Sequence, residues 1–234
     1  MLASIFFAGG NPFLAGIFVI LVLLLSVAIT LFVSSILGTT VLKGVDSSFT
    51  LELPPYRKPQ FAKVIIRSIM DRTIFVLGRA ICVSIPAGAL IWLLQNIMVG
   101  DMTLLGMFSY WLEPLGSAMG LSGAILAAFI LGIPANEIVI PILLMCYSQS
   151  GMLVETSGIV ELGEILRSNG WTMVTAICAI LFSLNHFPCA TTLWTVAKET
   201  KSLKWTAVSF LLPTMIGVIL CVFVNFLGKV LLGM

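Results

Sequence analysis

Residues 121–150 contain a single charged side chain, Glu137, which follows Asn136 and lies between Pro134 and Pro141. Neither proline can donate an N–H to the carbonyl four residues earlier, so two backbone oxygens need other partners, and a bound cation is one candidate. A carboxylate in apolar sequence costs at least ~2.5 kcal/mol to insert into a bilayer, which makes Glu137 a functional candidate. Alternatively, Glu137 faces water at the interface or caps the following helix, where its charge suits the helix dipole.

The only histidine, His186, and Cys189 flank a third proline, Pro188. Pro188 leaves the carbonyl of Leu184 without its usual helical donor. Imidazole and thiolate, together with the carboxylate of Glu137, are plausible ligands for a borderline divalent metal such as Fe(II). The alternatives are a histidine that hydrogen-bonds within the packed interior and a cysteine that packs as a small apolar side chain. Three further sulfur-bearing residues lie near prolines, and core packing is the simpler explanation for them: Cys82, Met145 and Cys146.

The composition indicates the solvent in which these residues are placed. The chain is 59% hydrophobic and 9% charged, whereas soluble domains carry about 25% charged residues. Residues 1–42, 80–100, 168–185 and 205–228 carry no charge, and a membrane helix needs about 20 apolar residues. We therefore predict an all-α fold, a polytopic membrane helix bundle with spans over residues 13–42, 78–97 and 205–232.

Several function classes lack their sequence signatures. The five cysteines form no CxxC pair, and the chain has no P-loop, no HExxH zinc motif and no GxSxG nucleophile motif. The basic residues are explained by membrane topology, so we expect no nucleic-acid partner. We do not expect this chain to be an enzyme.

Charge placement predicts the orientation. Residues 43–72 carry six basic and three acidic side chains, and residues 198–204 carry three lysines, so both connections should be cytoplasmic. Residues 100–120 carry only Asp101 and Glu113 and should form a loop on the outer side. Residues 121–197 must therefore cross the membrane an odd number of times. An amphipathic helix over residues 61–77, with Lys63 and Arg67 on one face, should lie at the interface.

Two arrangements satisfy this odd crossing. Either residues 121–150 form a re-entrant hairpin bent at residues 134–137 while 171–197 cross once, or 121–150 cross and 171–197 are re-entrant. Both contain discontinuous or re-entrant helices, and irregular backbone at membrane depth is tolerated only where protein or a water-filled cavity covers it. Secondary transporters bind their substrates at such breaks.

Several motifs resemble those of one family, the FeoB ferrous-iron transporters. The segment LELPPYRKP at residues 51–59, which includes Pro54, Pro55, Tyr56 and Arg57, is similar to that family's cytoplasmic proline-rich motif. GIPANEIVIP at residues 132–141 resembles its second gate motif. FPCATT at 187–192 and KET at 198–200 resemble its later cysteine-bearing segment, and the match continues through 205–206 and 213–214.

The resemblance implies a multi-pass protein of the cytoplasmic (inner) membrane that takes part in Fe(II) import. It implies three regions: a FeoB C-terminal-type region over residues 1–60, an interfacial helix with a nucleoside-recognition-like gate over 61–198, and a final span over 199–234. The family's GTPase domain and first gate would lie upstream of Met1, so GTP and Mg²⁺ would act only through that other part. The expected partners are the lipid bilayer, that amino-terminal part, a small FeoA-like accessory protein and further copies of the chain.

The leading hypothesis is that the chain forms half of an Fe(II) pathway. Glu137 and Cys189, with Asn136 and His186, would line it where two broken helices face each other near mid-membrane. A second hypothesis is a gate-type carrier for a nucleoside or other small solute, in which Asn136 and Glu137 hydrogen-bond a sugar. A third is a non-conducting membrane assembly subunit. The sequence leaves the choice between Fe(II) and Mn(II) open.

Overall fold

The computed structural model describes residues 2–6, 12–40, 63, 66–67, 73–148 and 158–232. Within these ranges the chain is helical apart from short connections and one small antiparallel hairpin, β1 (Met98–Val99) and β2 (Met102–Thr103). The prediction of an all-α membrane helix bundle is confirmed. Pro54, Pro55, Tyr56 and Arg57 lie outside the described residues, as does most of the predicted interfacial helix.

In the part of the chain that the structure describes, four helical segments are long and apolar enough to cross a membrane. They are α2 (Pro12–Thr40), α4 (Phe75–Asn96), the broken pair α9 (Met173–Asn185) and α10 (Ala190–Thr200), and α11 (Leu203–Leu232). Almost all of the apolar surface of α2 and α4 faces outward, as expected for helices that contact lipid or further membrane segments. Because α4 begins at Phe75, the second span starts earlier than predicted and includes the end of the expected interfacial helix.

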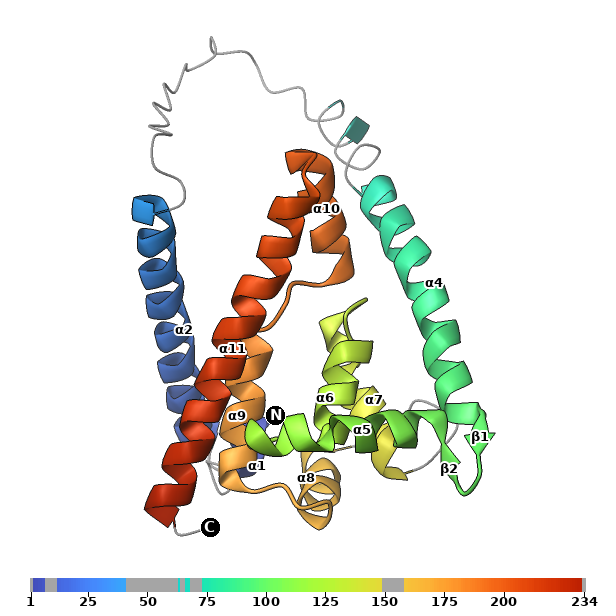
Figure 1. Cartoon of the computed structure of the whole chain (residues 1–234), viewed down its shortest axis with the longest axis vertical. Helices are drawn as coiled ribbons and strands as arrows, with labels where there is room; N and C mark the ends of the chain where they lie inside the picture. Colours follow the sequence, from blue (N-terminus) through green and yellow to red (C-terminus); the bar gives the residue numbers. More distant parts are fainter. Residues whose placement is uncertain are drawn as a thin grey trace.

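A short helical hairpin occupies the centre of the bundle. It comprises α6 (Gly123–Leu131), the 3₁₀ turn η2 (Asn136–Ile138) and α7 (Val139–Ser148). Most residues of α6 are buried, and with α7 and α9 they form the main hydrophobic core. In Figure 1 α6 rises toward the tip of the hairpin and α7 returns toward the end from which α6 started. The re-entrant alternative for residues 121–150 is therefore the one observed.

The predicted loop over residues 100–120 is wrong for most of its length, because residues Leu104–Ala118 form helix α5. Thr103 caps this helix by accepting a hydrogen bond from the N–H of Gly106 at 3.1 Å. The helix buries Leu105 and Leu112 and exposes Tyr110 and Trp111, a distribution typical of a helix at the membrane interface. It lies across the base of the bundle in Figure 1 and meets α6 at 110°.

The junction of α5 with α6 depends on an acidic residue. The Oε2 atom of Glu113 accepts a hydrogen bond from the N–H of Gly123 at 2.6 Å, at the start of α6. A carboxylate in this place satisfies a free N–H group and suits the positive end of the helix dipole. Glu113, predicted only as an outer-side charge, therefore stabilises the hairpin that carries Glu137.

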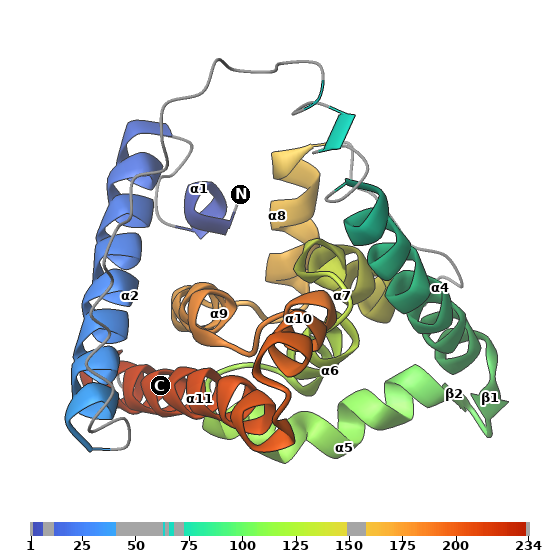
Figure 2. The same cartoon turned by 90° about the horizontal axis from the view of Figure 1, so that it is seen from above.

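The two ends of the molecule separate the charged segments as predicted. The turn between α10 and α11, which carries the three lysines, lies at the upper end in Figure 1, together with the end of α2 and the start of α4. The β1–β2 hairpin, α5 and α8 (Ile159–Ser168) lie at the lower end. Seen from above in Figure 2, α2, α4, α5 and α11 surround α6, α7, α9 and α10. On the charge placement, the lower end is the one predicted to face the outer side.

Candidate functional site at two helix breaks

The break between α9 and α10 lies at the middle of a membrane-length segment. The candidate span covers residues 173–200, and the non-helical residues 186–189 stand at its centre. Helix α9 is 13 residues long, which corresponds to about 20 Å at a rise of 1.5 Å per residue. His186 caps the end of α9 and Cys189 caps the start of α10, both with extended backbone. These two side chains are therefore held at the centre of this membrane-length segment.

The break between α6 and α7 is a tight turn that requires a glycine. A Cβ atom on Gly132 would lie 2.5 Å from Cγ2 of Val139 and 2.9 Å from the carbonyl oxygen of Ala128. Such contacts are shorter than packed atoms tolerate, so only glycine lets α7 return this closely over the end of α6. Pro134 lies within the turn, and Pro141 lies in the first turn of α7, where a missing N–H leaves no intrahelical bond unmade.

One expected free carbonyl is occupied. Pro134 has no N–H to donate to the carbonyl oxygen of Ile130. This oxygen instead accepts a hydrogen bond from the N–H of Ile133 at 3.3 Å. The turn thus satisfies this group internally by the tighter bonding usual at helix ends. The carbonyl of Ile130 is not available to a cation in this conformation.

The two breaks contact each other directly. The N–H of Ala190 donates to the carbonyl oxygen of Ile133 at 2.8 Å, which joins the start of α10 to the turn after α6. A second contact joins side chains: Nε2 of His186 lies 3.3 Å from Oδ1 of Asn136. The partners are 57 residues apart in the first contact and 50 residues apart in the second. Each break therefore holds the other in place. The structure therefore brings the residues of both proline motifs to one site.

His186 has both a packing contact and a polar contact. Its side chain is 9% exposed, and its ring packs against Phe129, Phe182 and Phe187 at centroid distances of 5.4, 5.7 and 4.8 Å. Aromatic surroundings of this kind fix the ring by burial and edge-to-face contact. The ring is thus oriented so that one nitrogen faces Asn136. These contacts are those of the packing alternative, a buried histidine with a hydrogen-bond partner, and the role of His186 as an ion ligand stays a prediction.

Cys189 is more accessible than His186. Its side chain is half-buried, and its Sγ atom lies 3.1 Å from both Oγ1 of Thr191 and Oγ1 of Thr192 in the first turn of α10. Thiol and hydroxyl groups can each donate or accept here. The three groups form a small polar cluster at a helix start that is otherwise surrounded by apolar sequence.

Asn136 and Glu137 are the exposed members of the site. Both lie in η2, at the tip of the central hairpin, and both side chains are exposed. Among the described residues, no three His, Cys, Asp or Glu side chains gather closely enough to hold a metal ion. The junction thus has an exposed amide and an exposed carboxylate from η2, a half-buried thiol at the start of α10 and a buried imidazole between them.

Three residues that support the site were not identified from the sequence. Asn185 is 8% exposed; its Oδ1 accepts from Oγ of Ser26 on α2 at 3.3 Å. A Cβ atom on Gly217 of α11 would lie 2.8 Å from the carbonyl oxygen of Asn185. Helices α2 and α11 are thus both fitted against the end of α9. The sequence signal that could have identified Asn185 is a polar side chain within an apolar helix, next to His186.

Comparisons with known proteins agree with the motifs. Residues 77–203 match the family described as "Nucleoside recognition", and residues 16–71 match "Ferrous iron transport protein B C terminus". The chain is 28% identical over 206 residues to the Fe(2+) transporter FeoB of Staphylococcus aureus strain MSSA476, covering 84% of this chain and 29% of that protein. It is 30% identical over 168 residues to the Synechocystis Fe(2+) transporter FeoB, covering 70% and 26%.

A third relative extends the match along the chain. The Fe(2+) transporter FeoB of Campylobacter jejuni is 25% identical over 233 residues, covering 94% of this chain and 37% of that protein. The chain therefore spans between about a quarter and two fifths of the length of these curated relatives. No solved structure matches it.

Proposed function

This chain belongs to the FeoB family, as part of the family's membrane portion, and from that membership we propose that it forms part of a path for ferrous iron across the cytoplasmic membrane. The relatives are Fe(2+) transporters, and the chain spans only a fraction of their length. The proposal therefore concerns a contribution to transport by a larger assembly. The transported ion is the substrate of that assembly.

The observation that carries the proposal is the contact between the two breaks. The bond from Ala190 to Ile133 and the contact of His186 with Asn136 join them, and one break lies at the centre of a membrane-length segment. Interrupted helices at this depth are tolerated only where protein or a water-filled cavity covers them, and such interruptions are where transporters bind their substrates. We infer that the polar groups at this junction face the path.

Glu137 and Cys189 are the proposed path-lining ligands. Glu137 supplies the negative charge that compensates an ion removed from water, because an exposed carboxylate at membrane depth is costly without a cation or water beside it. Cys189 supplies a soft ligand that suits Fe(II) better than Mg²⁺ or Ca²⁺. Asn136 and His186 join the two breaks and complete the set. A ligand set that binds weakly lets the ion both arrive and leave.

The remaining parts of the proposal concern groups outside this chain. Nucleotide control by GTP with Mg²⁺ would belong to an amino-terminal part supplied by another polypeptide or segment, as would a first gate. The exposed apolar faces of α2 and α4 leave room for further membrane helices. A FeoA-like accessory protein and self-association stay predictions of the family resemblance.

Radioactive iron uptake tests the proposal. The chain is co-expressed with the amino-terminal portion of a related transporter in cells lacking ferrous-iron uptake, and anaerobic ⁵⁵Fe(II) accumulation is measured. We expect Glu137→Gln and Cys189→Ala each to lower uptake by about tenfold or more, the effect typical of losing a metal-interacting group. Cys82→Ala, an exposed thiol on α4, is the matched control and should transport normally. Normal uptake by both site variants would remove these residues from the mechanism.

A second function has one observation in its favour. The family that covers residues 77–203 is described by nucleoside recognition, and Asn136 with Glu137 could hydrogen-bond a sugar. If this reading holds, a radiolabelled nucleoside should bind the purified chain, and Asn136→Ala should abolish that binding while Fe(II) has no effect. Saturable Fe(II)-dependent uptake without nucleoside binding would decide for iron.

A further inference from the structure

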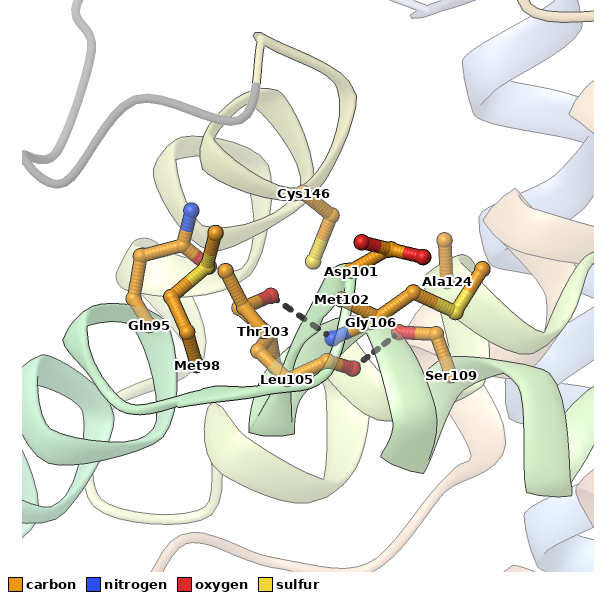
Figure 3. Close-up of a pocket in the computed structure, with 10 residues that line it drawn as sticks. All are labelled: Gln95, Met98, Asp101, Met102, Thr103, Leu105, Gly106, Ser109, Ala124 and Cys146. Atoms are coloured by element: carbon orange, nitrogen blue, oxygen red, sulfur yellow. Dashed lines mark hydrogen bonds between the residues drawn. The ribbon is translucent and has the colours of Figure 1, made fainter.

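A separate pocket opens at the outer end of the molecule, away from the helix breaks. Its volume is about 210 Å³, and it lies where the β1–β2 hairpin meets α5 and α7 (Figure 3). The chemically active side chains around it are Asp101, Met98, Met102 and Cys146. They come from the hairpin and from α7, so the pocket exists only because the central hairpin returns to this end.

The side chains that line this pocket carry different kinds of potential metal-ligand atom. In Figure 3 the thiol of Cys146 points down into the pocket, with the carboxylate of Asp101 and the thioether chain of Met102 on one side of it and the thioether chain of Met98 on the other. Asp101, Met98 and Met102 are exposed, whereas Cys146 is half-buried. A carboxylate with thiol and thioether sulfur is a mixed hard and soft donor set, which suits a borderline divalent transition metal better than Mg²⁺ or Ca²⁺.

The floor of the pocket is held by hydrogen bonds within the first turns of α5. Oγ1 of Thr103 accepts from the N–H of Gly106 at 3.1 Å, and Oγ of Ser109 donates to the carbonyl oxygen of Leu105 at 2.9 Å. Both hydroxyls thereby fix the first turns of α5. The Asp101 carboxylate and the sulfur atoms therefore lie beside a helix start that is fixed by its own hydrogen bonds, and a binding site requires such support.

We propose that this pocket is an outer acceptance site for a divalent transition metal of the Fe(II) class, held by Asp101 and Cys146 with the two methionines. The inference rests on the proposed iron path for its use, but the metal site itself is independent of transport. Water completes the coordination, so the ion exchanges readily. The surrounding outer face carries more acidic than basic residues among those described, which attracts cations; these residues are Asp101, Glu113, Glu161, Glu164, Arg167 and Lys229.

Metal binding by the purified full chain in lipid nanodiscs tests the site. Anaerobic equilibrium dialysis with ⁵⁵Fe(II) gives the affinity, and Co(II) gives a near-ultraviolet thiolate absorption band that reports a sulfur ligand. We expect Asp101→Asn and Cys146→Ala each to weaken Fe(II) binding by about tenfold or more, and Cys146→Ala to remove the Co(II) band. Met102→Leu should weaken binding less, because a thioether carries no charge.

Matched controls lie on the same face. Glu164→Gln removes an exposed acid from α8, and Met107→Leu removes an exposed thioether from α5 outside the pocket; both should bind Fe(II) as the unmodified chain does. Binding that is unchanged in Asp101→Asn and Cys146→Ala overturns the site, even if Glu137→Gln abolishes uptake. Binding that depends on Asp101 and Cys146, in a reconstituted transporter that moves no iron, keeps the site and overturns the proposed function instead.

Discussion

At the scale of single residues, the site combines groups that are packed with groups that are open. His186 is enclosed by three phenylalanines and contacts Asn136 through one nitrogen. Glu137 and Cys189 are the accessible members. The buried histidine fixes the junction, and the open carboxylate and thiol are free to meet an ion. Different substitutions should therefore separate folding from transport.

His186→Phe separates the packing of the ring from its polar contact. Phenylalanine should keep the contacts with Phe129, Phe182 and Phe187 but lose the bond to Asn136, at a cost of about 1 kcal/mol for one hydrogen bond. We expect nearly normal thermal stability in detergent together with reduced ⁵⁵Fe(II) uptake. His186→Ala, which also opens a cavity, should lower stability as well. Unimpaired uptake by the phenylalanine variant would show that the ring acts only in packing.

Glu113→Gln tests the residue that caps α6. Glutamine keeps the shape of the side chain and an oxygen that can accept the bond from Gly123, but it loses the negative charge at the positive end of the α6 dipole. The free energy of unfolding should therefore fall by about 0.3–1 kcal/mol. Denaturation in mixed micelles measures this change. The exposed acid Glu164 on α8 supplies the control, since Glu164→Gln should leave stability unchanged. Equal stability of both variants would contradict the capping role.

At the scale of elements, the sequence predicted the ends of helices better than the contacts between helices. The breaks near Pro134 and Pro188 and the membrane-length apolar segments were readable from proline positions and charge-free runs, because these are local signals. Charge placement required an odd number of crossings over residues 121–197 but left open which segment is re-entrant. The bond from Ala190 to Ile133 was not readable, since partners 57 residues apart leave no periodic pattern. Helix α5 was missed because its glycines and Pro114 resemble loop composition.

The close approach of α11 to the second break is a property of two helices and depends on Gly217. A larger side chain there would press on the carbonyl of Asn185, and overpacking of this kind costs ~1–3 kcal/mol. We expect Gly217→Leu to lower the thermal midpoint and to reduce uptake together. Gly88→Leu on α4, where a Cβ meets nothing within 4 Å, is the matched control. If both variants behave alike, the fit of α11 against α9 does not position the site.

At the scale of the whole molecule, the arrangement predicts which end faces the cytoplasm. The lysine-bearing turn between α10 and α11 and the acidic outer face with Asp101 lie at opposite ends, in agreement with the positive-inside rule. In a variant without native cysteines, Lys201→Cys should react with a membrane-impermeant maleimide only after spheroplasts are opened. Tyr110→Cys, on α5, should react in intact spheroplasts. The reverse pattern would invert the topology and move the outer pocket to the cytoplasmic side.

The central claim, that the joined breaks line an ion path, is tested most directly by the reactivity of Cys189. In the restored transporter, the rate of Cys189 modification by a small thiol reagent is measured with and without Fe(II) under anaerobic conditions, with the cysteine of a Lys201→Cys substitution in the exposed turn after α10 as the internal control. We expect Fe(II) to slow modification of Cys189 but not of that reference cysteine, and Glu137→Gln to abolish this protection. A Cys189 rate that is the same with and without Fe(II) would contradict the account.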